Sequence, residues 1–264
     1  MTKWEIKKTG NLKNLKNTIL IEGLPGIGNV GKITADFLLE EIKAKKVYDI
    51  FSYTFPHSVF INEDSLIELP SISIYHKKIK NNDILFLVGD IQPSEEETCY
   101  EFCDKILDIA HENKCKQIVA LGGIGLHSEP KKPKVYATGY NKKTIKDFIK
   151  GTEINNKLFG VVGPIIGVSG LLVGLAQKRK IDAVTLLAET SANPIHIGIN
   201  SSKELIEILN NKYSLGIDLK ALKKEIELIE KDALIKTGQI EEVSKSSALK
   251  KLQKKAGEPV DYIG

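Results

Sequence analysis

Three glycines after an apolar run have the spacing of a phosphate-binding turn. The stretch IEGLPGIGNVGKIT contains Gly26, Gly28 and Gly31, and Lys32 follows the last glycine directly. In a P-loop, backbone amides and the Lys hold phosphates, and a Ser or Thr directly after that Lys binds magnesium. Here Ile33 takes that place. The segment therefore lacks the metal ligand of a P-loop.

The same glycines also fit the G-x-G-x-x-G pattern of a dinucleotide fold, which needs a carboxylate about 20 residues onward at the end of a second strand. Asp49 lies inside that expected strand and not at its end. Glycine is equally suited to a strand-to-helix turn that needs left-handed backbone or close helix packing. A phosphate site and a purely structural turn both remain open from the sequence.

Three other glycine-rich segments follow apolar runs, and so do two acids, Asp90 and Glu189. The segments are Gly89–Pro93, Gly122–Gly125 and Gly163–Gly170. Because ligands of parallel sheets bind at the carboxyl ends of strands, a pocket is expected where these segments meet. Such acids are also common as solvated or turn-stabilising residues. The candidate ligand-binding residues are Gly26, Gly28, Gly31, Lys32, Asp90 and Glu189.

The remaining reactive side chains do not form a catalytic or metal-binding pattern. Ser169 lies in G-V-S-G-L, one position short of the second glycine of a nucleophile elbow, and is better explained as a helix cap. The histidines are scattered without the spacing of metal ligands, and the cysteines suit free thiols of a reducing compartment. We therefore expect no catalytic residues, no metal and no cofactor.

The composition argues against nucleic-acid and membrane binding. The chain has 264 residues, a net charge of +4 and a single arginine, Arg179, so it is poorly equipped for bidentate contacts to phosphate or guanine. No run of 18 apolar residues and no signal-peptide pattern is present. These features predict a cytoplasmic protein.

Short apolar runs alternate with amphipathic segments, which is typical of an α/β fold with a mostly parallel sheet and a mixed edge. The segment Asn62–Ser65 is expected to form a hairpin turn. Strands are expected near 18–22, 47–53, 58–62, 72–76, 84–88, 117–121, 134–139, 158–162 and 183–187. Helices are expected near 29–43, 94–113, 142–149, 168–180 and 201–211.

Three regions are expected along the chain: an α/β core domain over residues 1–214, an amphipathic helix over 215–237 and a tail over 238–264. The helix has an apolar stripe that suits packing either on its own sheet or on another subunit. The tail ends in a short aromatic and apolar tip that suits the capture of a partner. The stripe includes Leu219, Leu222, Ile226 and Ile229, and the tip consists of Val260, Tyr262, Ile263 and Gly264.

Several segments, taken in order, resemble the archaeal proteasome-assembly-chaperone family, relatives of the second eukaryotic proteasome assembly chaperone. They include G-x-P-x-x-G-x-V-G at Gly23–Gly31, G-D-x-Q-P at Gly89–Pro93, and S-G-L-L-x-G-L-A at Ser169–Ala176, followed by Glu189-Thr190. The similarity spans residues 19–209. It implies a three-layer α/β fold similar to purine nucleoside phosphorylases, without established catalytic residues.

The resemblance also implies a homo-oligomer, a tetramer or a pentamer, that acts without ATP. Some members are expected to engage proteasome α-subunits through a C-terminal hydrophobic-tyrosine-any tripeptide, whereas here Tyr262 is third from the end. We therefore expect a non-enzymatic chaperone for a proteasome subunit or another assembly factor. The alternatives are a phosphorylase-like or nucleotide-hydrolysing enzyme with a ligand at the glycine-rich strand ends, and a scaffold for an unrelated complex.

Overall fold

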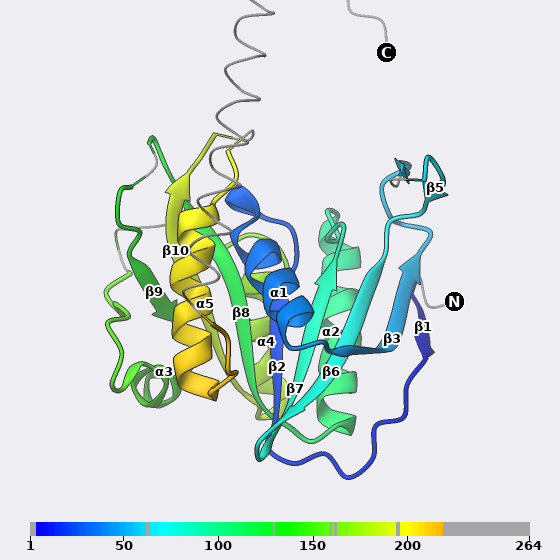
Figure 1. Cartoon of the computed structure of the whole chain (residues 1–264), viewed down its shortest axis with the longest axis horizontal. Coiled ribbons are helices and arrows are strands. Elements are labelled where there is room, and N and C mark those ends of the chain that lie inside the picture. The colour runs from blue at the N-terminus through cyan, green and yellow to red at the C-terminus, as the bar shows by residue number, and fades with distance from the viewer. Residues whose placement is uncertain are drawn as a thin grey trace, which may run out of the picture. The chain divides into compact units, whose positions relative to one another are not determined.

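The computed structural model describes residues 4–61, 64–128, 130–158, 160, 163–193 and 196–218. They form a three-layer α/β unit that runs through Ile217 (Figure 1). The predicted amphipathic stripe at Leu219, Leu222, Ile226 and Ile229, and the tail tip at Val260, Tyr262, Ile263 and Gly264, lie outside the described residues. The division at residues 214 and 237 therefore stays a prediction.

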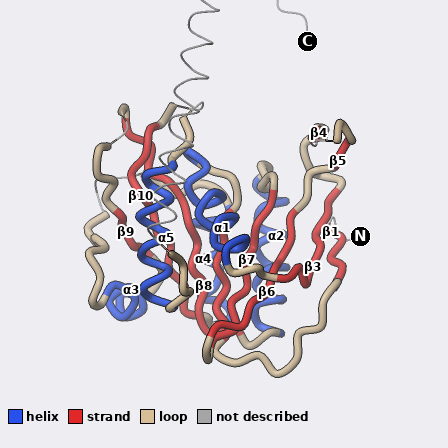
Figure 2. The backbone as a smooth tube through the Cα atoms, viewed as in Figure 1, coloured by secondary structure: helices blue, strands red, loops and turns tan. Residues whose placement is uncertain are grey.

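An eight-stranded sheet forms the middle layer, in the order β1-β3-β6-β7-β2-β8-β10-β9 (Figure 2). The four central strands β7, β2, β8 and β10 are mutually parallel, and the outer strands pair antiparallel. The strands are β1 Trp4–Lys8, β2 Thr18–Gly23, β3 Lys45–Ser52, β6 Ile72–Ile79, β7 Asn82–Gly89, β8 Cys115–Leu126, β9 Val135–Thr138 and β10 Asp182–Ser191. The predicted mixed α/β sheet is confirmed.

Helices cover both faces of the sheet. Helices α1 (Val30–Glu41) and α5 (Ile199–Tyr213) pack together on one face, and α2 (Glu96–Glu112) and α4 (Val168–Ala176) pack together on the other. Helix α3 (Lys142–Ile149) lies beside β9 and β10. Because both faces are covered, the central strands are mostly apolar, and every residue of β2 is buried, including Thr18 and Glu22.

A separate two-stranded ribbon consists of β4 (Phe60–Ile61) and β5 (Ile67–Glu68), which pair antiparallel. This pairing confirms the hairpin predicted around Asn62–Ser65. The ribbon follows β3 and stands beyond the ends of β3 and β6 in Figure 1.

The observed strands differ from those expected at 158–162, at β1 and at the short strand β5, which was not predicted. In the predicted strand at 158–162, the described residues Leu158 and Gly160 belong to no strand. The edge strand β1 was not predicted, because its Lys-rich sequence WEIKK resembles a solvated segment more than a strand. It is held by antiparallel pairing with β3 and by the buried ring of Trp4. No described helix is long and apolar enough to cross a bilayer.

Candidate functional site

The first glycine-rich loop joins β2 to α1 and brings the helix into backbone contact with the sheet. A Cβ atom on Gly31 would lie 2.5 Å from the carbonyl oxygen of Leu121, and one on Gly23 would lie 2.4 Å from the carbonyl oxygen of Gly31. Gly28 has a φ of 60°, in the left-handed region that favours glycine. These glycines therefore have structural reasons to be present. A Cβ on Gly26 would meet nothing within 4 Å.

The first glycine loop and the predicted segments Gly122–Gly125 and Gly163–Gly170 meet at the carboxyl ends of the parallel strands. They surround a cavity of about 540 Å³. Gly26 and Gly31 lie in its wall, whereas Gly28 packs against Thr190 and Gly198. The wall is formed mainly by glycine backbone and aliphatic side chains, and its described residues include Gly122–Gly125, Gly163–Ile166 and Ser169. Largely apolar walls with a few polar groups are typical of small-molecule sites.

Gln92, in the G-D-x-Q-P turn after β7, joins two of these loops. Its Nε2 donates to the carbonyl oxygen of Pro25 at 2.6 Å, and its Oε1 accepts from the backbone N–H of Val168 at 3.2 Å. Gly167, at φ 91°, gives this side chain room, because a Cβ there would lie 2.6 Å from Oε1. Gln92 therefore links the first glycine loop to the start of α4, a role that the sequence motif did not reveal.

Lys32 and Asp90 lie close together, outside the described wall of the cavity. The Lys32 Nζ is 2.9 Å from Asp36 Oδ2 and 3.9 Å from Asp90 Oδ1, and it donates to the carbonyl oxygen of Gly89 at 3.1 Å. Asp90 also accepts from the N–H and the hydroxyl of Ser71. Burial raises the pKa of Asp36, and the Lys32 ammonium opposes this. These groups stabilise the junction of α1, β7 and β6.

Glu189 is used differently from Lys32 and Asp90. Its Oε2 accepts from the backbone N–H of Lys134 at 3.0 Å, and its Oε1 accepts from the Tyr136 hydroxyl at 3.1 Å. These contacts connect β10 to Tyr136 of β9 and to Lys134, just before β9. Burial, and secondarily the Glu189 carboxylate, raise the pKa of Tyr136. Of the six candidate ligand residues, only Gly26 and Gly31 line the cavity. Gly28 packs against Thr190 and Gly198, whereas Lys32 and Asp90 share one network and Glu189 lies at the β9 edge.

Glu22 is a buried acid that sequence reasoning missed. It is fully buried at the end of β2, and its Oε1 accepts from the backbone N–H of Leu24 at 2.9 Å. Its Oε2 has no hydrogen-bond partner among the described residues. Burial raises its pKa to about 7, and Leu24, Ser169 and the backbone at Leu121 oppose this only in part. The available signal was an acid inside the otherwise apolar run TILIEG.

Ser169 contributes to the packing of α4 and does not cap it, contrary to the expectation from the sequence. Gly167 occupies the cap position of α4. The Ser169 hydroxyl donates to the carbonyl oxygen of Leu121 at 3.1 Å, and its own carbonyl accepts from the Thr185 hydroxyl at 2.8 Å. These two contacts connect the first turn of α4 to β8 and β10.

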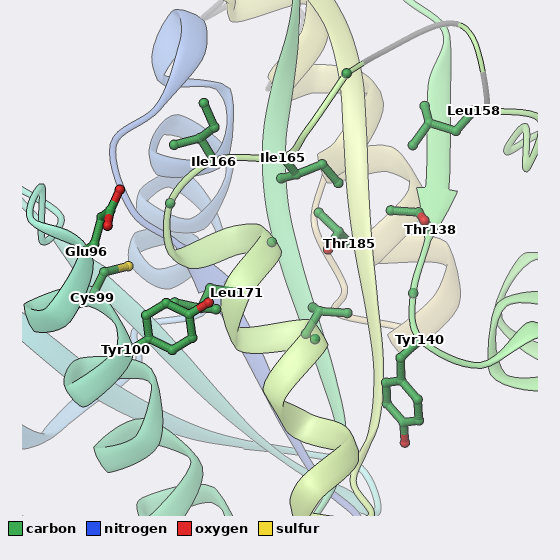
Figure 3. A pocket seen from close by; sticks show the side chains of 16 residues that line it. Glu96, Cys99, Tyr100, Thr138, Tyr140, Leu158, Ile165, Ile166, Leu171 and Thr185 are labelled. Atoms are coloured by element: carbon green, nitrogen blue, oxygen red, sulfur yellow. The ribbon is translucent and has the colours of Figure 1, made fainter.

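A second cavity, of about 970 Å³, lies across α4 between α2 and β9. In Figure 3, Cys99 and Tyr100 face it from α2, and Tyr140 lies on the opposite side. Gly163, Ile165 and Ile166 line both cavities. The neighbouring thiol of Cys103 lowers the pKa of Cys99, whereas the pKa of Cys103 itself is raised. The described residues contain no cluster of three metal-ligating side chains.

Comparison with known proteins identifies the family. The PAC2 family matches residues 20–233, so the chain belongs to the PAC2 family, as the sequence resemblance predicted. An uncharacterized protein of Methanocaldococcus jannaschii, MJ1210, is 29% identical over 224 residues, which cover 85% of this chain and 84% of that protein.

Two solved structures from Pyrococcus furiosus are also similar. PbaB, described as an archaeal proteasome activator, is 28% identical with a TM-score of 0.79, over 90% of this chain and 100% of PbaB. PbaA, described as an archaeal homolog of proteasome-assembly chaperone, is 25% identical with a TM-score of 0.72, over 95% of this chain and 99% of PbaA. The similarity thus spans nearly the whole of both proteins.

Proposed function

We propose that this PAC2-family protein is an ATP-independent assembly chaperone or scaffold that acts on proteasome subunits as a homo-oligomer. The observation that carries the proposal is the similarity to PbaB and PbaA over at least 90% of this chain, at 25% identity or more. The candidate site is also consistent with a protein that acts by binding other proteins through its surface. Lys32, Asp90 and Glu189 are all engaged in contacts that stabilise the fold.

The C-terminal tail is the part that we propose contacts the client. Its tip contains Tyr262 beside aliphatic residues, a combination that buries apolar area with little loss of side-chain entropy. We propose that the client is a proteasome subunit or another assembly factor, bound through the tip as a whole.

Deletion of Gly257–Gly264 tests the tail. Calorimetric titration of the full-length protein with proteasome α-subunits of its own organism should lose at least tenfold in affinity on deletion, with an unchanged melting temperature. Tyr262→Ala should reproduce most of the loss, and Lys255→Ala, outside the tip, is the matched control. If the deletion variant binds as tightly as the full-length protein, the tail model is wrong.

A small-molecule ligand is the second function that an observation favours. The cavity of about 540 Å³ lies where three glycine-rich segments meet, the position expected for a ligand of a parallel sheet. Titration with nucleosides, nucleotides and phosphate should give saturable heat if a phosphorylase-like or nucleotide-hydrolysing activity exists. Gly26→Val, which narrows the cavity at an open position, should abolish that heat. An absence of heat at every temperature would exclude these ligands.

A further inference from the structure

The β4–β5 hairpin, defined as the described residues of 56–69, is the most exposed apolar segment of the described chain. Each of its residues from Pro56 to Leu69 is exposed. In Figure 2 it stands apart from the main sheet, above the ends of β3 and β6. Seven large apolar side chains on the hairpin and at its base are exposed by 44–85%: Tyr53, Val59, Phe60, Ile61, Leu66, Ile67 and Leu69.

The strand register sorts these side chains onto two faces. Ile61 pairs with Ile67, and Phe60 pairs with Glu68. Because side chains alternate along a strand, Val59 lies on the same face as Ile61, and Leu69 on the same face as Ile67. One face is thus entirely aliphatic, and the opposite face carries Phe60, Leu66 and Glu68. We call the first the aliphatic face, consisting of Val59, Ile61, Ile67 and Leu69.

The aliphatic face is a contiguous apolar patch of the kind that often marks an interaction site. Its four side chains are 49%, 73%, 72% and 63% exposed. A two-stranded ribbon is only marginally stable unless one of its faces is covered. Four such side chains form a patch on the order of a few hundred Å², so two faces in contact approach the lower bound of about 1,000 Å² for a specific interface.

We propose that the aliphatic face binds the same face of a second copy of this chain. The face has no charge and no hydrogen-bonding side chain, so its partner must present an apolar surface, and the same face of a second copy is such a surface. Two identical aliphatic faces, in contrast, are complementary to each other about a two-fold axis. Stacked about 10 Å apart, as packed sheets are, the ribbons place Ile61 and Ile67 of both copies at the centre. Glu68, on the opposite face, stays in water.

This inference deepens the homo-oligomeric part of the proposed function and rests on it. A two-fold contact joins copies in pairs, so a closed assembly built with it contains an even number of copies. The hairpin lies on residues 56–69, so its contribution can be tested separately from that of the tail at 257–264.

Charge placed on the aliphatic face tests the proposal. Multi-angle light scattering on the full-length protein should give an even multiple of the 29.2 kDa chain. Ile61→Lys and Ile61→Glu should each halve the molar mass or reduce it to that of one chain, because like charges would meet in a desolvated contact. Mixing the two variants should restore the original mass, since opposite charges then meet. Leu66→Lys, on the opposite face by register, is the matched control and should keep the wild-type mass.

Each alternative has a distinct result. A wild-type monomer, an odd number of copies, or an unchanged mass for Ile61→Lys would overturn the proposal. If the variants have a lower molar mass that is not restored when Ile61→Lys and Ile61→Glu are mixed, the proposal is also wrong, because the two aliphatic faces would then not meet. If Ile61→Lys keeps its mass but loses affinity for proteasome α-subunits, the hairpin binds the client instead. Self-association and client binding are measured separately, so failure here is distinguishable from failure of the proposed chaperone function.

Discussion

The glycine-lined carboxyl edge and the β4–β5 hairpin lie at the same end of the sheet and are held in opposite ways. At the carboxyl edge, helices and loops approach the strands at backbone distance, and Gln92 connects two loops across the cavity. In the hairpin, every described residue of 56–69 is exposed, and its order depends on the pairing of β4 with β5. The first region is determined by packing within the chain, and the second presents a surface that suits a partner.

The largest difference in the free energy of unfolding is expected when an isoleucine is replaced by alanine in the buried sheet and in the hairpin. Ile74 of β6 is fully buried, and Ile67 of the hairpin is 72% exposed. In the Ile61→Lys background, where association is removed, Ile74→Ala should lower the free energy of unfolding by about 4 kcal/mol. Ile67→Ala should change it by no more than about 0.5 kcal/mol. Urea denaturation measures both, and similar losses would show that the hairpin packs within its own chain.

A pH-dependent effect is expected for the buried acid next to the cavities. The pKa of Glu22 is about 7 in the folded protein against an ordinary value of 4.5, so the folded state holds this proton more tightly than the unfolded state. Stability from this group therefore falls as the pH rises from about 4.5 to about 7, by about 3 kcal/mol in total. Glu22→Gln should remove that fall and exceed the wild type in stability above pH 7. If the stability of the two proteins depends on pH in the same way, the raised pKa of Glu22 does not affect folding.

A smaller loss of stability is expected when glycines of the first loop are replaced by alanine. Gly31 is needed for packing, whereas Gly26 lines the cavity in open space. Gly31→Ala forces a Cβ against the carbonyl oxygen of Leu121 and should destabilise the fold by about 2 kcal/mol. Gly26→Ala, in open space and at a φ of −160°, should leave stability within about 0.5 kcal/mol. Thermal unfolding distinguishes the two. Equal losses would mean that the loop as a whole, and not the helix-to-sheet contact, requires glycine.

The smallest effect is expected for the connection between the loops. Gln92→Ala removes the hydrogen bonds to Pro25 and Val168 and should lower the free energy of unfolding by about 1 kcal/mol. Gln177→Ala, at an exposed position after α4, is the matched control and should have no measurable effect. A neutral result for Gln92→Ala would show that the two glycine loops are held without it.

Periodicity and glycine placement predicted much of the fold but little of the site. The apolar runs of β2, β7, β8 and β10 predicted buried parallel strands, and the glycine-rich segments predicted where a cavity would form. Strand β1 was missed because its sequence carries three charges in five residues. Its position depends on a partner strand that is distant in the sequence.

The chemistry of the site depended on contacts between distant segments. The pKa of Glu22 depends on how completely α4 and α2 cover the end of β2, which no local pattern encodes. Glu189 and Asp90 resembled each other in sequence, each following an apolar strand. The pairing of β10 with β9 directs Glu189 to Lys134 and Tyr136, whereas Asp90 accepts from Ser71. Sequence alone therefore grouped residues that the structure separates.

Light scattering of the full-length protein, alone and mixed with proteasome α-subunits of its own organism, tests the central claim most directly. The chaperone account predicts a defined homo-oligomer with an even number of copies that shifts to a larger species when α-subunits are added. A defined oligomer whose molar mass stays the same in the presence of α-subunits would contradict the proposed function. That result would direct the search to other partners and to ligands of the glycine-lined cavity.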